Sequence, residues 1–219
     1  ELMRNLVSHT AKDSPAAPPR GTVAVIGEER WQKIFHAMGV NLTEDPATAR
    51  VIVLAKKHGQ SDAAVESWLE NGINVLLLRG AELPGFTGWT WQNPADHYGS
   101  RQVPNWPELR GLSIGDFHFR TRYPFPTLSG PGVGAEGLVA RKANGAGVML
   151  ATALDPTWLR TDQQPFMRLT AWRHSRALGQ MICGLGGSME LDGQIFNLAS
   201  LPTGELPLVG TWQAVQTQS

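Results

Sequence analysis

Three short, largely apolar runs constrain the fold of this chain more than any other feature of its sequence. They cover residues 22–26, 51–55 and 73–78. Runs of this length and composition are typical of parallel strands buried on both faces of a sheet. Helical patterns lie between them, over residues 28–38 and over residues 62–71, which Ser61 can cap. Strands that alternate with helices in this way predict an α/β fold with a mostly parallel sheet.

The regular alternation stops after the third run. Residues 79–107 are rich in Gly, Pro, Trp and Asn. This stretch is too long for an ordinary connection, so we expect a functional loop or an interface loop. Apolar runs then flank Asn144-Gly145 and predict an antiparallel hairpin over residues 138–151. The strongest helical pattern of the chain follows at residues 168–185 and ends in glycines.

These patterns divide the chain into three parts. Residues 1–21 form an N-terminal extension that includes a Pro/Ala-rich linker, and residues 22–190 form one α/β domain. Residues 191–219 form a C-terminal extension with an apolar strand pattern at 206–212. We expect the partners of that strand to lie beyond residue 219. Because the chain starts at Glu1 and not at Met, we interpret it as processed or cut from a longer polypeptide.

Composition narrows the classes of function. The formal net charge at pH 7 is zero. Because no basic field is available to attract nucleic acid or anionic lipid, neither is expected as a partner. No run approaches the roughly 18–20 apolar residues of a membrane span, which predicts a soluble protein. A single cysteine cannot form an intrachain disulfide and leaves the compartment open.

The segment 107–120 carries an unusual set of side chains. Leu109 and Leu112 flank a glycine, and Asp116 is followed by Phe, His118, Phe and Arg120. This pattern predicts a short turn that leads into an edge segment with one polar and one apolar face. Asp116 and Arg120 can form an ion pair that holds the shape of the segment, and we favour that role over one in catalysis.

The carboxyl ends of parallel strands are where the sites of α/β proteins gather. The turn after the first strand has one glycine and then Glu28 and Glu29, which suit a helix N-terminus but would repel a phosphate. A nucleotide or flavin site is therefore not expected there, and no cofactor is predicted. The turn after the third strand, residues 79–81, holds neither Cys nor Ser, so it cannot serve as a nucleophile elbow.

Other residues that could carry chemistry have simpler explanations. Cys183 lies at the end of a helical pattern and is expected to be a core residue, because reactive thiols need an electropositive, partly open setting. The glycine run at 129–134 has the wrong flanks for a phosphate loop and is expected to be a flexible loop. His97, Asp116 and His118 lack the spacing of metal ligands, so no metal site is predicted.

Three tryptophans, Trp89, Trp91 and Trp106, crowd the irregular region. Large rigid aromatic side chains can fill the core beneath a long loop or anchor a contact with another domain. They can also stack on a sugar ring. We keep all three interpretations open. The carbohydrate or interface candidates are therefore Trp89, Trp91, Trp106, Asp116, His118 and Arg120, and no catalytic residue is assigned.

The order of these elements resembles the amidotransferase-like, flavodoxin-like accessory domain of bacterial family 2 and other β-galactosidase-type glycoside hydrolases. The resemblance rests on Pro107, Leu109, Gly111 and Leu112, which lead to Asp116 and Arg120. It also rests on the hairpin at 137–151 with the following Asp155-Pro156, and on the start of the last helix at 168–176. It implies a three-layer flavodoxin-like fold, resembling class I glutamine amidotransferases, with a C-terminal antiparallel hairpin. The pattern at 206–212 is similar to the first strand of the jelly-roll sugar-binding domain of family 2 enzymes.

The resemblance implies a role outside catalysis. Amidotransferases use a Cys-His-Glu set that has no match here, and the catalytic carboxylates of the glycosidases belong to a separate barrel domain. We therefore expect a non-catalytic module that supports oligomerisation or shapes a carbohydrate site. Its partners would be other domains of the same polypeptide, carbohydrate, or further copies of the chain, in the bacterial cytoplasm, in the periplasm or outside the cell. Two alternatives remain open: a stand-alone small-molecule binder that uses His58 and Glu82, and a cryptic hydrolase that uses Ser129 or Cys183.

Overall fold

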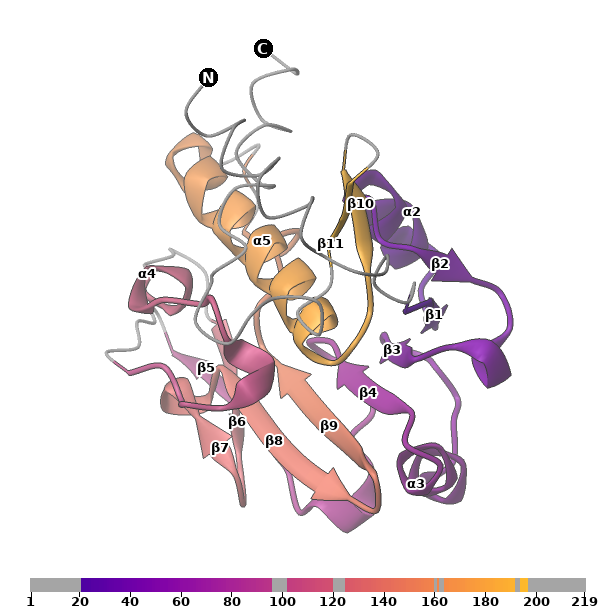
Figure 1. Cartoon of the computed structure of the whole chain (residues 1–219). Coiled ribbons are helices and arrows are strands. Elements are labelled where there is room, and N and C mark those ends of the chain that lie inside the picture. The colour runs from indigo at the N-terminus through magenta and orange to yellow at the C-terminus, as the bar shows by residue number, and fades with distance from the viewer. Residues whose placement is uncertain are drawn as a thin grey trace.

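A seven-stranded sheet runs through the centre of the computed structural model (Figure 1). The structure describes residues 21–95, 102–119, 125–159, 161, 164–191 and 194–196. The strand order is β2-β1-β3-β4-β9-β8-β7; the first five of these strands run parallel, and β8 and β7 join through antiparallel pairings. The strands are β1 (Val23–Ile26), β2 (Leu42–Thr43), β3 (Val51–Leu54), β4 (Asn74–Leu77), β7 (Val133–Gly134), β8 (Val139–Asn144) and β9 (Gly147–Thr152).

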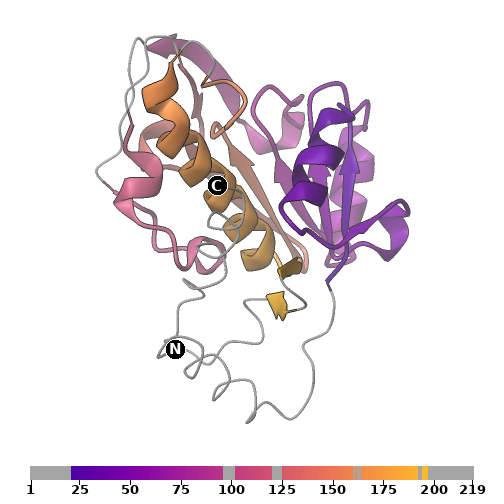
Figure 2. The same ribbon diagram turned by 90° about the horizontal axis from the view of Figure 1, so that it is seen from above.

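Helices cover both faces of this sheet. Helices α2 (Arg30–Ala37) and α5 (Arg168–Gly184) pack on one face, and α3 (Asp62–Glu70) packs on the other (Figures 1 and 2). Alternate residues of each strand enter the two resulting cores: Val51 and Val53 of β3 join the first core, and Ile52 joins the second. Because β3 is buried on both sides, its residues can be apolar throughout. The predicted α/β class with a mostly parallel sheet is confirmed.

The elements with the clearest local patterns form where the sequence predicts them. Helix α3 begins after Ser61, whose hydroxyl accepts a hydrogen bond from the N–H of Ala64 at 3.3 Å. The predicted hairpin is formed by β8 and β9, which end in the Asn144–Gly147 pair. Gly145 in its turn has a φ of 59°, and a Cβ there would lie 2.8 Å from the backbone of Glu70. The turn thus needs glycine for its conformation and for its contact with α3.

The stretch 79–107 is more regular than the sequence suggests. It contains a 3₁₀ turn (Gly85–Thr87) and the strand β5 (Thr90–Ala95), which pairs antiparallel with β6 (Phe125–Ser129) in a separate two-stranded sheet. The expectation of an irregular loop was wrong for this part, because the partners of β5 in β6 lie 30 or more residues away in the sequence. The glycine run at 129–134 connects β6 to β7, and Gly132 has a φ of 68°.

Residues 107–119 form two short helical turns, not the predicted edge segment. They are a 3₁₀ turn (Pro107–Leu109) and α4 (Ile114–Phe117), in which Ser113 and Asp116 form a capping box. This segment, which we call the strap, lies along α5. Side chains of α5 hold three of its carbonyl groups: Gln180 donates to Arg110, Arg176 to Gly111 and Arg173 to Gly115. Capping and contact with α5 therefore override the extended pattern of aromatic residues.

A small hairpin follows α5. It is formed by β10 (Met189–Leu191) and β11 (Gln194–Phe196). Several expected features lie outside the described residues: the Pro/Ala-rich linker within residues 1–20, the residues His97 and Arg120, and the strand pattern at 206–212. Within the described ranges, no helix has both the length and the apolar character that crossing a membrane requires.

Candidate functional site

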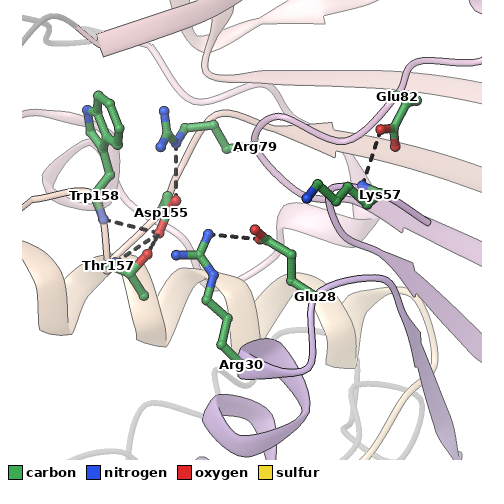
Figure 3. A network of polar contacts seen from close by, with 8 residues as sticks. All are labelled: Glu28, Arg30, Lys57, Arg79, Glu82, Asp155, Thr157 and Trp158. Carbon is green, nitrogen blue, oxygen red and sulfur yellow. Dashed lines mark hydrogen bonds and ion pairs between the residues drawn. The ribbon is translucent and has the colours of Figure 1, made fainter. Parts of the chain in front are cut away.

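Polar side chains gather where the parallel strands end. Glu28 follows β1, Lys57 follows β3, Arg79 follows β4 and Asp155 follows β9. Because the carboxyl ends of parallel neighbours meet at one edge of the sheet, these side chains lie close together (Figure 3). We call this group the strand-end cluster. It contains these four residues together with Arg30, Glu82, Thr157 and Trp158.

An ion pair joins the ends of β4 and β9. The Nε–H of Arg79 donates to Oδ2 of Asp155 at 3.1 Å, and the two side chains are 14% and 1% exposed. The other carboxylate oxygen of Asp155 accepts hydrogen bonds from the N–H groups of Thr157 and Trp158 and from the Thr157 hydroxyl. The Trp158 ring lies against the guanidinium, with its centroid 3.8 Å from Cζ of Arg79. This contact fixes the plane of the guanidinium.

Two further pairs complete the cluster. Arg30, at the start of α2, lies 3.0 Å from the carboxylate of Glu28. On the other side, the N–H of Lys57 donates to Glu82 at 3.2 Å, and buried His58 contacts the same residue. Although burial opposes ionisation, hydrogen bonds from the N–H groups of Glu82 and Lys57 lower the pKa of the Glu82 carboxyl. His58 and Glu82, the residues suggested for a small-molecule site, therefore bind each other.

The turn after β4 holds neither Cys nor Ser. The turn after β4 consists of Arg79, Gly80 and Ala81, and Arg79 is occupied by Asp155. Cys183 lies buried in α5, where desolvation raises the pKa of its thiol to about 12. At neutral pH such a thiol is protonated and unreactive. Among the described residues, no group of His, Cys, Asp and Glu side chains could hold a metal ion.

The structure separates the polar residues that sequence analysis placed on the strap. Asp116 is buried, and its carboxylate pairs with Arg176 of α5. The expected partner, Arg120, lies outside the described residues. His118 is exposed at the end of α4. Next to them, Arg141 of β8 donates two hydrogen bonds of 2.9 Å to buried Glu108, which raise the pKa of Arg141. These contacts hold the strap in place.

The three candidate tryptophans point inward. Trp89 is 5% exposed and its indole N–H donates to the carbonyl of Pro131. Trp91 donates in the same way to Ala81, and Trp106 packs partly buried against the core beside Gly134. Because the indole N–H groups of Trp89 and Trp91 are used within the chain, their contacts are those of core residues beneath a loop.

Sequence analysis missed Trp158 and His174. Trp158 lies in the strand-end cluster, and the signal that could have revealed it is its position two residues after the Asp155-Pro156 pair that follows a buried strand. His174 is fully buried in α5 between Phe119 and Phe125, and both its ring nitrogens lack a hydrogen-bond partner among the described residues. Its position four residues before Leu178 and seven before Met181 places His174 on the apolar stripe of this helix, and that spacing could have revealed its burial.

The chain is similar to several solved structures, but the comparisons of its sequence found no match. No protein family model matches the chain, and no curated protein sequence matches it. The solved structures similar to it include the exo-β-1,4-mannosidase Op5Man5 from Opitutaceae bacterium strain TAV5 (12% identity, 81% of this chain, 38% of that chain, TM-score 0.46). A glutamine amidotransferase from Thermotoga maritima is also similar (13% identity, 76% of this chain, 96% of that chain, TM-score 0.46). So is a β-galactosidase from Rahnella sp. R3 (12% identity, 81% of this chain, 33% of that chain, TM-score 0.46). The chain thus spans 38% of the length of the mannosidase and 33% of the length of the β-galactosidase.

Proposed function

We propose that this chain is a non-catalytic, amidotransferase-like module of a larger glycoside hydrolase of the β-galactosidase kind. The observation that carries the proposal is the Arg79–Asp155 ion pair. It occupies the ends of two adjacent parallel strands, where an α/β enzyme would place its reacting groups. An arginine that is bound to a buried carboxylate and covered by an indole offers neither a nucleophile nor a general base.

The order of the parallel strands supports a flavodoxin-like architecture. Numbered along the chain, the five parallel strands follow one another in the sheet as 2-1-3-4-5. This is the order of flavodoxin-like doubly wound folds. The hairpin partner β8 and the short β7 extend the sheet beyond the fifth parallel strand. A three-layer flavodoxin-like domain with an added antiparallel edge therefore accounts for the whole sheet.

An exposed apolar area supports a role in contacts with other domains. Ile114 of α4 is 52% exposed, Phe166 in the 3₁₀ turn before α5 is 63% exposed, and Leu169 in the first turn of α5 is 57% exposed. Arg173 links α4 to α5 by donating to the carbonyl of Gly115. Exposed large apolar side chains on elements that contact each other, as α4 and α5 do, mark surfaces that contact a partner. Another domain of the same polypeptide, or a further copy of the chain, is the partner that we propose.

Two measurements test the proposed function. The purified chain is incubated with nitrophenyl β-galactoside, nitrophenyl β-mannoside and glutamine, and we expect no turnover above the blank. An antibody raised against residues 22–190 is then used on extracts of the source organism, where we expect a polypeptide much longer than 219 residues. Turnover that is lost in a Cys183→Ser or a Ser129→Ala variant would establish a hydrolase and refute the proposal, as would a native polypeptide of 219 residues.

A further inference from the structure

The guanidinium of Arg79 is fixed in place with part of its hydrogen-bonding capacity unused. Of its five N–H donors, the one on Nε is bound to Asp155. The two terminal nitrogens have no hydrogen-bond partner within the described residues. A guanidinium held by a carboxylate on one side and by an indole face is pre-oriented to bind an oxyanion through these nitrogens.

A second guanidinium lies close to the first. Arg30 contacts Glu28 through one terminal nitrogen and is 49% exposed, so other donors of its fork remain available. Burial lowers the pKa of Arg79, and the positive charge of Arg30 lowers it further. Figure 3 shows the side chains of both arginines beside Asp155. Two adjacent guanidinium groups are a favourable arrangement for an anion.

The first strand-to-helix turn favours an anion more than its sequence suggests. Glu28 and Glu29 were expected to repel a phosphate there. In the structure each has a basic partner: Glu28 pairs with Arg30, and Glu29 lies 2.8 Å from Lys33. Helix α2 begins directly after these residues, and the positive end of its dipole faces the cluster. The exposed side chain of Lys57 has no acidic partner within the described residues.

We propose that Arg79 and Arg30, assisted by Lys57, bind the carboxylate or phosphate group of a small molecule at the carboxyl ends of β1, β3 and β4. Arg79 and Arg30 donate to the oxyanion, and Trp158 holds Arg79 in the required plane. Asp155 keeps Arg79 at the strand end in the absence of the ligand. The inference goes beyond the proposed role as a module and does not depend on it, because binding at this site requires no hydrolysis and no further domain.

Calorimetric titration of the whole chain in 20 mM buffer tests this site. The probes are inorganic phosphate, galacturonate and, as a neutral control, galactose. We expect saturable binding of at least one anion, weakened when NaCl is raised to 0.5 M, and no binding of galactose. Tighter binding of galacturonate would identify a carboxylated sugar as the ligand class, and tighter binding of phosphate a phosphorylated one. The absence of saturable binding for both anions would overturn the inference.

Two charge-removing variants locate the site. Arg30→Gln removes one charge-assisted donor from an exposed side chain and should weaken anion binding about tenfold without unfolding the protein. Lys33→Gln is the matched control, because it removes the same charge from the same helix at a residue that is paired with Glu29 outside the cluster. Equal affinities of the two variants would show that the anion binds elsewhere and would overturn the inference. Neither result bears on the assays of hydrolysis.

Discussion

Two buried aspartates in different regions of the molecule use the same arrangement. One carboxylate oxygen of Asp155 binds the turn that follows it, and the other accepts a hydrogen bond from Arg79. In the strap, one oxygen of Asp116 accepts hydrogen bonds from the N–H and hydroxyl of Ser113, and the other pairs with Arg176. All four side chains of the two ion pairs are at most 14% exposed. Each aspartate thus closes a local turn and ties it to a distant arginine.

The two pairs differ in what else holds their partners together. Arg79 and Asp155 follow β4 and β9, whose backbones are hydrogen-bonded from Val75–Met149 to Leu77–Ala151. The sheet therefore sets the distance between them. The strap has no such pairing with α5, and side-chain contacts alone position it. The Asp116–Arg176 pair therefore holds the strap on α5, whereas the Asp155–Arg79 pair orients the side chain of Arg79 at the strand ends.

The largest effect is expected from Asp116→Ala. The substitution leaves Arg176 buried without its partner and removes the capping box, which should lower the free energy of unfolding by about 3 kcal/mol. Amide hydrogen exchange in residues 107–119 should accelerate more than exchange in the sheet, because the strap opens locally.

Asp155→Ala is the matched comparison for this prediction. It also removes the partner of a buried arginine and lowers stability, but the amides of β4 and β9 should keep their protection, because their backbone pairing remains. If Asp116→Ala leaves the strap as protected as the sheet, side-chain contacts do not position the strap, and the distinction between the two regions fails.

A methyl group added to α5 under the strap is expected to have the next largest effect. A Cβ at Gly184 would lie 2.1 Å from the carbonyl oxygen of Glu108, a backbone atom that can move only with the strap. Gly184→Ala should therefore lower the free energy of unfolding by about 2 kcal/mol, despite the better helix propensity of alanine. Denaturant titration measures the difference.

Gly179→Ala, in the same helix, is the control for this effect. Its Cβ would meet the side chain of Met189, the far end of a flexible group that can move aside. We expect this variant to be nearly as stable as the unmodified protein. Equal losses for both glycines would show that the contact with the strap is no tighter than ordinary core packing.

The contrast between the regions also explains which features the sequence could predict. The strands β1, β3 and β4, the hairpin β8–β9 and helix α5 depend on local patterns and on burial, so they were predicted closely. The pair of Asp116 with Arg176 joins residues 60 positions apart, and sequence analysis proposed the nearby Arg120 in its place. The pairing of β5 with β6 and the stacking of Trp158 on Arg79 are likewise set by tertiary contacts. Local patterns reveal elements, but they do not reveal which distant side chains meet.

The free energy of unfolding should depend on pH through His174, on which the charges of both aspartates act. Burial lowers the pKa of His174 from 6.5 to about 4, although the charges of Asp155 and Asp116 act in the opposite direction. Below pH 6.5 His174 takes up a proton in the unfolded chain but not in the native protein. The contribution of neutral His174 to the free energy of unfolding is therefore present above pH 6.5 and is lost as the pH falls toward 4. Between pH 7 and pH 5 the free energy of unfolding should fall by about 2 kcal/mol.

Two variants isolate this proton. His174→Phe replaces the imidazole with a ring that suits its neighbours Phe119 and Phe125, and it should flatten the pH dependence between pH 7 and pH 5. His36→Gln removes an exposed histidine and should leave the dependence in place. A His174→Phe protein with an unchanged slope would assign the pH dependence to other groups.

The smallest effect is expected from Trp158→Leu, which tests whether the two regions are independent. The leucine keeps an apolar side chain but removes the ring from the guanidinium of Arg79, which should lower the free energy of unfolding by about 1 kcal/mol. Because the sheet still holds β4 next to β9, Arg79 stays at the strand end but loses its fixed plane, so anion binding should weaken more than stability. Hydrogen exchange in residues 107–119 should not change. Faster exchange there would show that the strand-end cluster and the strap are coupled through α5, and the assignment of separate roles to the two aspartates would then have to be abandoned.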